Sequence, residues 1–167
     1  LTGGAGQDNL FGDAGNDNID GGDFDQAAGF DEHDYLDGGD GDDWLYFGRN
    51  DDVVGGAGYD TAMPDYSKAA SGVEVNLSTL ISGAFGGNAG AGTVQGVEAI
   101  YAVWGSPFDD RIELGSVVLG SAAPFTPGPY PSVFAGNGND TVIGGSANDA
   151  FFGQEGDDTL IGGGGTD

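Results

Sequence analysis

The chain has 167 residues, enough for one domain, and its 28 acidic side chains against three basic ones give a formal net charge of −25. Nucleic acids and anionic lipid surfaces bind clustered Lys and Arg, so this composition excludes both as partners. There is no cysteine for a disulfide or thiolate metal site, and no apolar run near the roughly 20 residues needed for membrane insertion. The expected partner is a cation, without which we expect disorder.

The chain opens with a nine-residue repeat. Two copies, GGAGQDNLF (3–11) and GDAGNDNID (12–20), stand in tandem, and GGDGDDWLY (38–46) and GGAGYDTAM (55–63) follow later. The glycines predict a tight turn because glycine accepts positive φ, and the last three residues predict a short strand with its middle residue inward. The inward residues expected along the whole chain are Leu10, Ile19, Leu36, Leu45, Val142, Phe151 and Leu160.

An insertion interrupts the spacing after the second copy. Asp17 and Asp34 lie 17 residues apart rather than nine, which predicts a loop at about 24–31. Its acids Asp23, Asp25 and Asp31 either bind a further ion or are solvated loop residues. The sequence leaves both readings open.

A deletion follows. Asp43 and Asp60 also lie 17 residues apart, where two repeats need 18, so FGRNDDVV has lost one residue. Either Asp51 or Asp52 therefore holds the aspartate place of this repeat. Val53 is the inward residue in the first case and Val54 in the second.

The segment 64–114 lacks the repeat. Alternation at Val73, Val75 and Leu77, and the apolar stretch GVEAIYAVWG, predict that the same solenoid continues with wider coils, held by ordinary side-chain burial. GSPFDDRIEL is a degenerate repeat with Asp110 in the aspartate place and Ile112 inward. The segment 115–133 is rich in Pro and Gly, which predicts an inserted surface loop.

A second tandem run closes the sequence at 134–167, with Asp140, Asp149, Asp158 and Asp167 nine residues apart. A chain that turns every nine residues completes a coil in eighteen, so turns two repeats apart stack at the ~4.8 Å spacing of neighbouring strands. Stacked carboxylates repel unless a cation lies between them. Calcium fits best, because it takes oxygens from carboxylates and from the carbonyls that glycine-rich turns expose.

The ninth-place residues should point away from the core, yet they include Phe11, Tyr46, Ile143, Phe152 and Ile161. Residues eighteen apart share a face, so Ile143 and Ile161 are expected on one side and Phe134 and Phe152 on the other. Loops or neighbouring domains cover these side chains, or they form an exposed patch for a partner.

GGAGQDNLF and GNGNDTVIG resemble the RTX (repeats-in-toxin) nonapeptides of secreted bacterial proteins. The resemblance implies an all-β fold, a right-handed parallel β-roll, with about six to ten calcium ions held between turns of adjacent coils. It also implies that sixth-place aspartates bridge ions and that glycine-turn carbonyls complete each site. The carboxylates carried over by place are Asp8, Asp17, Asp34, Asp43, Asp51 or Asp52, Asp60, Asp140, Asp149, Asp158 and Asp167, with Asp23 and Asp110 as further candidates. The glycines carried over are Gly3, Gly4, Gly6, Gly12, Gly15, Gly38, Gly39, Gly41, Gly55, Gly58, Gly136, Gly138, Gly144, Gly153 and Gly156.

Residues 1–167 are thus expected to form one solenoid, with RTX runs at 1–63 and 134–167. The segment 64–114 resembles the calcium-poor rungs that separate such runs. The expected function is a calcium-binding module that folds outside the cell, stabilises a secreted bacterial protein and supports its type 1 export. One alternative is a subunit of an extracellular filament, adhesin or surface layer that self-associates head to tail. Another is the export module of an exoenzyme whose catalytic domain lies elsewhere, since the sequence opens inside a repeat and is expected to be a fragment.

No catalytic site is expected in these residues. The single histidine, His33, lies in the inserted region with no identifiable nucleophile or orienting partner. The zinc-protease pattern H-E-x-x-H and the nucleophile elbow G-x-S-x-G do not occur.

Overall fold

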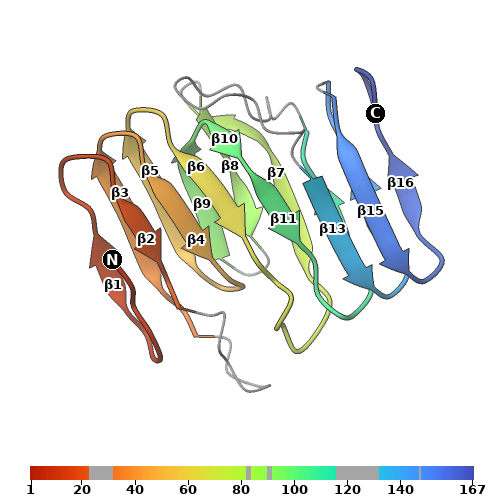
Figure 1. Ribbon diagram of the computed structural model, residues 1–167, viewed down its shortest axis with the longest axis horizontal. Coiled ribbons are helices and arrows are strands. Elements are labelled where there is room, and N and C mark those ends of the chain that lie inside the picture. The colour runs from red at the N-terminus through yellow and green to blue at the C-terminus, as the bar shows by residue number, and fades with distance from the viewer. Residues whose placement is uncertain (23–31, 82–83, 90–91, 116–131, 147) are drawn as a thin grey trace.

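A computed structural model of the chain describes residues 1–22, 32–81, 84–89, 92–115, 132–146 and 148–167. Over these ranges it forms sixteen strands, wound into a flattened roll with two layers (Figure 1). None of the described residues belongs to a helix long and apolar enough to cross a membrane. The expected all-β parallel roll is confirmed.

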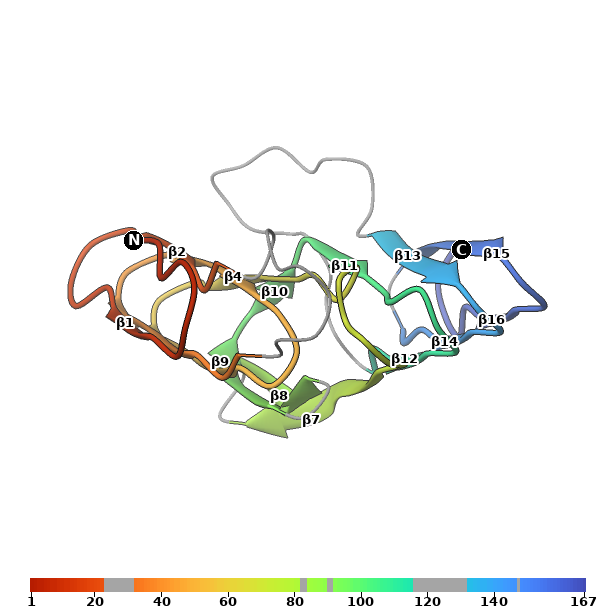
Figure 2. The same cartoon turned by 90° about the horizontal axis from the view of Figure 1, so that it is seen from below.

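One layer is a nine-stranded sheet in the order β1-β3-β5-β9-β8-β7-β12-β14-β16. Its strands are β1 (Asn9–Phe11), β3 (Tyr35–Asp40), β5 (Asp52–Ala57), β7 (Glu74–Ile81), β8 (Ala84–Ala89), β9 (Gly92–Val97), β12 (Arg111–Glu113), β14 (Thr141–Ile143) and β16 (Thr159–Ile161). The other layer, seen edge-on in Figure 2, holds a four-stranded and a three-stranded sheet. These contain β10 (Ala99–Ile100), β6 (Thr61–Pro64), β4 (Trp44–Phe47) and β2 (Asn18–Asp20), then β11 (Ala102–Trp104), β13 (Ser132–Asn137) and β15 (Ala150–Glu155).

The core lies between the two layers and is built from the middle residue of each short strand. Ile19, Leu36, Leu45 and Val142 are fully buried, as the alternation of a strand requires. Leu10 and Phe151 are partly buried and pack against this core. Leu160 pairs with Val142 but is 43% exposed, because β16 is an edge strand with no further strand beside it.

The segment between the two repeat runs departs from the expected winding. Val73, Val75 and Leu77 are buried as predicted, but β7, β8 and β9 pair antiparallel, so parallel coils do not continue unbroken here. The connections fall at 82–83 and 90–91, outside the described residues. Two-residue connections containing glycine suit hairpins, which join antiparallel strands, whereas parallel strands need a longer crossover.

Both predicted loops fall largely outside the described residues. These include the 24–31 insertion with Asp23, Asp25 and Asp31, and residues 116–131 of the second loop. Strand β13 begins at Ser132, and Val133 is buried. The second loop was therefore predicted two residues too long at its end, because the buried Val133 continues the strand pattern.

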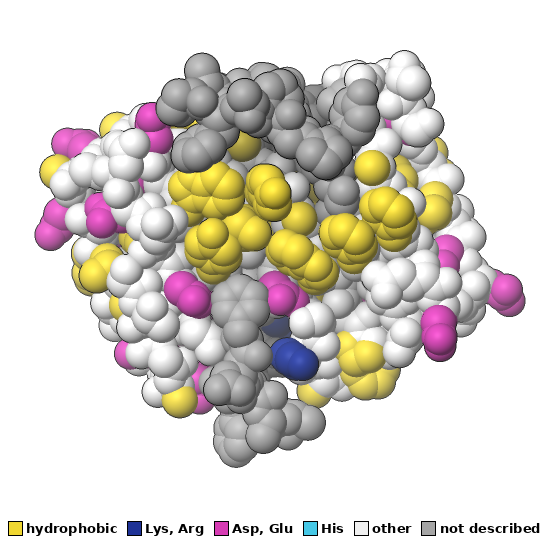
Figure 3. Space-filling view, in the orientation of Figure 1, with side chains coloured by type: hydrophobic (Ala, Val, Ile, Leu, Met, Phe, Trp, Pro, Cys, Tyr) yellow, Lys and Arg dark blue, Asp and Glu magenta, His cyan; other side chains and the backbone are white. Residues whose placement is uncertain are grey.

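Ninth-place side chains lie on the outside of the roll. As predicted, Ile143 pairs with Ile161 and Phe134 with Phe152. Phe134 stacks between Trp104 and Phe152, with ring centroids 6.1 Å and 5.0 Å apart. Figure 3 shows hydrophobic side chains gathered in a band over the face formed by the four-stranded and three-stranded sheets. Phe152, in the three-stranded sheet, is 49% exposed. The roll therefore presents an apolar strip among its acids.

Candidate metal centre

The glycine turns divide into two kinds of position. The second and fourth places have positive φ, for instance 98° at Gly39 and 145° at Gly41, where a side chain would be strained. The other predicted glycines with positive φ are Gly4, Gly6, Gly15, Gly58, Gly136, Gly138 and Gly156. The first place is instead crowded, and Gly3, Gly12, Gly38, Gly55, Gly144 and Gly153 occupy it.

The aspartates at the sixth place of each repeat stack along the roll and are joined by hydrogen bonds. We call this stack the aspartate ladder. The backbone N–H of Asp17 donates to Oδ1 of Asp43 (2.8 Å), and that of Asp43 donates to Oδ1 of Asp60 (3.0 Å). The same bond joins Asp8 to Asp34, Asp34 to Asp51, Asp110 to Asp140, Asp140 to Asp158 and Asp149 to Asp167, at 2.8–3.1 Å. The structure thus brings together the carboxylate pairs that the repeat spacing predicts, and it adds the pair of Asp110 and Asp140, which lie 30 residues apart.

The second oxygen of several of these carboxylates has no donor. Oδ2 of Asp8, Asp43, Asp60 and Asp140 is buried with no hydrogen-bond partner among the described residues, and so is Oδ1 of Asp149. Asp43, Asp60 and Asp140 are at most 1% exposed. A buried acceptor left unsatisfied costs about 1–3 kcal/mol, and more if charged. These oxygens therefore call for a positive partner.

At Asp8, Asp43 and Asp60, this second oxygen lies beside a carbonyl of the neighbouring coil. A Cβ atom added to Gly38 would lie 2.3 Å from Oδ2 of Asp43 and 2.3 Å from the carbonyl oxygen of Gly55. The two oxygens therefore converge on a point where only glycine fits. The same arrangement of carboxylate and carbonyl recurs at Gly3, Gly12, Gly55 and Gly144.

Burial raises the pKa of carboxylates in this ladder, and a bound cation would lower it again. Desolvation, with smaller contributions from Glu98 and Asp43, raises the pKa of Asp60 to about 7. Desolvation, followed by the charges of Asp110 and Asp158, raises the pKa of Asp140 to about 6. A neighbouring cation stabilises the ionised form and would lower both pKa values.

The donor set fits calcium. Among the described residues no three His, Cys, Asp or Glu side chains cluster closely enough to hold a metal. Backbone carbonyls of the next coil, such as that of Gly55, lie beside these carboxylates and would supply the further oxygens. Mixed carboxylate and carbonyl coordination is typical of calcium, whereas zinc favours imidazole and thiolate.

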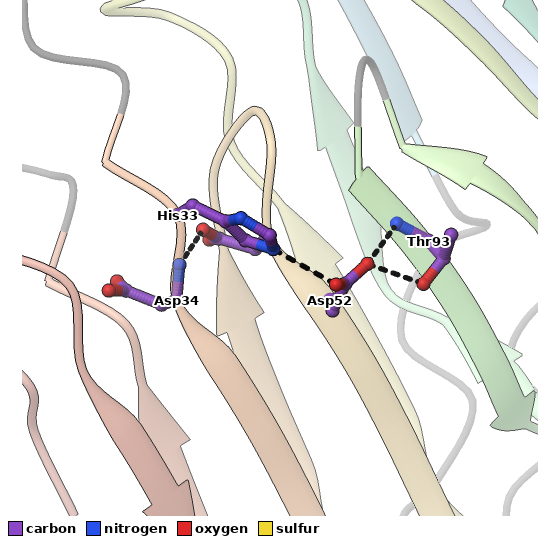
Figure 4. A network of polar contacts seen from close by, with 5 residues as sticks. His33, Asp34, Asp52 and Thr93 are labelled. Atoms are coloured by element: carbon purple, nitrogen blue, oxygen red, sulfur yellow. Dashed lines mark hydrogen bonds and ion pairs between the residues drawn. The ribbon is translucent and has the colours of Figure 1, made fainter.

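The structure separates the two candidates left open at the deletion. Asp51 is fully buried, and its carboxylate accepts the N–H of Asp34 (2.9 Å) and of Gly48 (2.8 Å), so it occupies the ladder position. Asp52 instead contacts Nε2 of His33 (2.9 Å) and the hydroxyl of Thr93 (2.6 Å), as Figure 4 shows. The Thr93 hydrogen bond is the main reason that the pKa of Asp52 is lowered.

Asp110, like Asp51, has a donor for each of its two oxygens. Its Oδ1 accepts the Val73 N–H (2.8 Å) and the Ser106 hydroxyl (2.6 Å), and its Oδ2 accepts the Ser106 N–H (2.6 Å). Its own turn thus satisfies both oxygens. The remaining predicted carboxylates, Asp17, Asp158 and Asp167, place Oδ2 beside the first-place glycines Gly12, Gly153 and Gly162, at 3.0, 2.2 and 2.1 Å from an added Cβ. The ligand roles of all these residues stay predictions.

Sequence reasoning missed a second ladder at the fifth place of the repeat. The N–H of Asp42 donates to Oδ1 of Asn16 (3.1 Å), and that of Asp157 donates to Oδ1 of Asn139 (3.0 Å). Tyr59 and Asp42, Asn139 and Asp109, and Thr166 and Asn148 form the same bond. These bonds run from the later coil to the earlier one, opposite to the aspartate ladder. The frequent Asn or Asp before the sixth-place aspartate was the available signal.

It also missed Glu98 and the carbonyls of Gly21, Gly96 and Gly162, which face first-place glycines. Glu98 stands in the ladder beside Asp60 and accepts its N–H (2.8 Å). Glu98 precedes the buried Ile100 by two residues, as Asp43 precedes Leu45. That spacing could have identified it.

A family model of the RTX calcium-binding nonapeptide repeat, four copies long, matches residues 1–25, 29–54 and 134–167, just over half of the chain. No curated protein matches the chain. RTX repeats bind calcium and are typical of secreted bacterial proteins. The matched stretches carry most of the aspartate ladder and its glycine turns. The chain belongs to the RTX calcium-binding nonapeptide repeat family.

Proposed function

We propose that this chain is a module that folds when it binds calcium outside the cell and thereby stabilises a secreted bacterial protein. The observation that carries the proposal is the set of buried carboxylate oxygens, at Asp43, Asp60 and Asp140, that have no donor in the described part of the chain. They stack on neighbouring coils, where their charges repel. A bound divalent ion replaces that repulsion with attraction.

The rest of the fold offers little to offset the loss of the ion. The core receives one inward residue from each short repeat strand, as at Ile19, Leu45 and Val142. Ordering the backbone costs about 1–2 kcal/mol per residue, and 36 glycines make this cost high. In a domain of this kind the free energy of metal binding becomes free energy of folding.

Calcium-coupled folding also suits export. A chain that is disordered at low calcium can leave the cell unfolded through a type 1 exporter and fold where calcium is plentiful. Extracellular calcium modules bind with dissociation constants of about 10⁻⁴–10⁻³ M, well above cytosolic levels of the ion. In this proposal the described residues contribute stability and export competence, and any catalysis belongs to another part of the parent protein.

Far-ultraviolet circular dichroism during a calcium titration tests this function. We expect a coil spectrum in chelator, a β-sheet spectrum at saturating calcium and a steep transition between them. Magnesium is the control, because it demands stricter octahedral geometry and retains its waters. An unchanged β-sheet spectrum in chelator would overturn the proposal.

A further inference from the structure

The aspartate ladder continues past the last nonapeptide of the first run. Strand β10 pairs with β6 so that Ala99 lies opposite Thr61, which sets Glu98 beside Asp60. The N–H of Asp60 donates to Oε2 of Glu98 (2.8 Å), as the N–H of Asp43 donates to Oδ1 of Asp60 (3.0 Å). Glu98 therefore takes the place that an aspartate holds elsewhere in the ladder.

The arrangement in which a first-place glycine lies beside both a carboxylate and a carbonyl is repeated at this point. We call this arrangement the glycine cradle. A Cβ added to Gly55 would lie 1.9 Å from the carbonyl oxygen of Gly96 and 2.6 Å from Oδ2 of Asp60. At the preceding coil the equivalent oxygens belong to Gly55 and Asp43, both 2.3 Å from a Cβ on Gly38. Gly96 thus supplies a carbonyl from a segment that has no nonapeptide.

Asp60 itself indicates a ligand. Its side chain is fully buried, and its Oδ2 has no hydrogen-bond partner within the described part of the chain. The charges that act on it are those of Glu98, Asp43 and Asp42, all negative. A buried oxygen aimed at a carbonyl among acidic neighbours is the environment that a hard divalent cation satisfies.

We propose that Glu98 completes a calcium site with Asp60 and the Gly96 carbonyl, at the boundary where the nonapeptides end. This site lies outside the stretches that match the repeat family, which stop at residue 54 and resume at 134. It rests on the calcium binding of the proposed function and extends it onto a coil whose sequence carries no repeat. The ladder of the first run therefore ends with a bound ion.

The variant Glu98→Gln tests the site. Glutamine keeps the side-chain length and the oxygen that accepts the Asp60 N–H, and it removes only the charge. Native mass spectrometry in calcium should count one ion fewer per chain than in the wild type, with a β-sheet circular dichroism spectrum at saturating calcium. The matched control is Glu74→Gln, which removes one charge from an exposed residue of β7 and should leave the ion count unchanged.

A second measurement leaves the three proposed ligands, Glu98, Asp60 and Gly96, unchanged. Tyr59 directly precedes Asp60 in the chain, and the charge of Glu98 contributes to raising its pKa, after the larger effect of desolvation. Terbium bound in calcium sites emits when a nearby tyrosine is excited, so Tyr59→Phe should lower the sensitised emission of the terbium-loaded protein. An equal ion count in Glu98→Gln and wild type, or unchanged emission in Tyr59→Phe, would overturn the site. Failure of the wild type to bind any calcium would instead overturn the proposed function.

Discussion

Asp43 and Asp110 occupy the same place of the repeat template in two regions of the roll, and both are buried. Asp43, in a GGDGDD turn, receives the Asp17 N–H on one oxygen and has no donor for the other among the described residues. Asp110, in a GSPFDD turn, receives three hydrogen bonds, two of them from Ser106. At Asp110 the hydroxyl and the N–H of Ser106 supply donors from within the turn. At Asp43 one oxygen has no donor among the described residues and is left for an ion.

The difference separates two ways of stabilising a turn of the same shape. A satisfied carboxylate contributes hydrogen bonds to a charged group, worth roughly 1.5–3 kcal/mol each, without any ion. A carboxylate with an open oxygen is unfavourable until a cation arrives. The repeat runs should therefore depend on calcium more strongly than the turn at Ser106.

The largest expected effect comes from Asp43→Asn. This variant removes a ligand charge, and we expect the midpoint of the calcium transition to rise about tenfold or more, equivalent to about 1.4 kcal/mol per tenfold. Asp110→Asn should move the midpoint by less than about twofold, but should lower stability at saturating calcium by about 1–3 kcal/mol, because its amide would face the Ser106 N–H. Calcium titrations and thermal unfolding of both variants give the comparison. Equal shifts of the two calcium midpoints would contradict the distinction between Asp43 and Asp110.

Gly38→Ala should have an effect almost as large. Its Cβ would contact Oδ2 of Asp43 and the carbonyl of Gly55 at 2.3 Å, so it fills the space where these oxygens converge. We expect a severalfold to tenfold rise in the calcium midpoint at roughly 1.4 kcal/mol per tenfold. Gly164→Ala is the control, because its Cβ would meet nothing closer than 3.6 Å. Matching midpoints for the two alanine variants would show that the cradle does not bind the ion.

The pH dependence of folding and of calcium binding should follow the carboxylates that have an oxygen without a donor among the described residues. Burial raises the pKa of Asp60 from 3.8 to about 7 and that of Asp140 to about 6. The metal-free fold therefore holds protons that the unfolded chain releases, and its free energy of unfolding falls as pH rises from about 4 to about 7. Calcium must displace these protons, so its apparent affinity should be several-fold weaker near pH 5.5 than near pH 7.5. Circular dichroism titrations at both pH values test this, and a pH-independent midpoint would contradict it.

The smallest effect is expected from the fifth-place ladder. Asn139→Ala removes the acceptor for the Asp157 N–H, which is exposed, and should cost about 0.5–1.5 kcal/mol at saturating calcium without changing the number of bound ions. Asn139→Asp keeps an acceptor oxygen and should retain most of that stability. Thermal unfolding of the two variants distinguishes a register bond from a metal ligand. A lower ion count in Asn139→Ala would refute the assignment.

The repeat runs could be predicted well because their period and chemistry agree. A nine-residue period fixes which aspartates stack, and the pairs such as Asp140 with Asp158 follow from it. Alternation fixes the inward residue, as Leu45 shows. The choice between Asp51 and Asp52 needed the structure, because a one-residue deletion leaves two registers open. The burial of Asp51 and Val53, with the hydrogen bonds that Asp51 accepts, decides between them.

Other features of the fold cannot be predicted from the nine-residue period. Glu98 is separated from Asp60 by an antiparallel excursion, so its place in the ladder depends on long-range pairing of β6 and β10. The antiparallel strands themselves arise where short glycine-containing connections replace the repeat. The head-to-tail assembly considered from the sequence stays a prediction, which calcium-dependent light scattering at several protein concentrations would test.

A crystal structure of the calcium-loaded protein, with anomalous difference density recorded for the ion, tests the central claim most directly. The account predicts density between neighbouring coils beside the open oxygens of Asp43, Asp60 and Asp140, and weaker density or none beside Asp110. A well-ordered roll with the same stacked aspartates and no density beside any of them would contradict it.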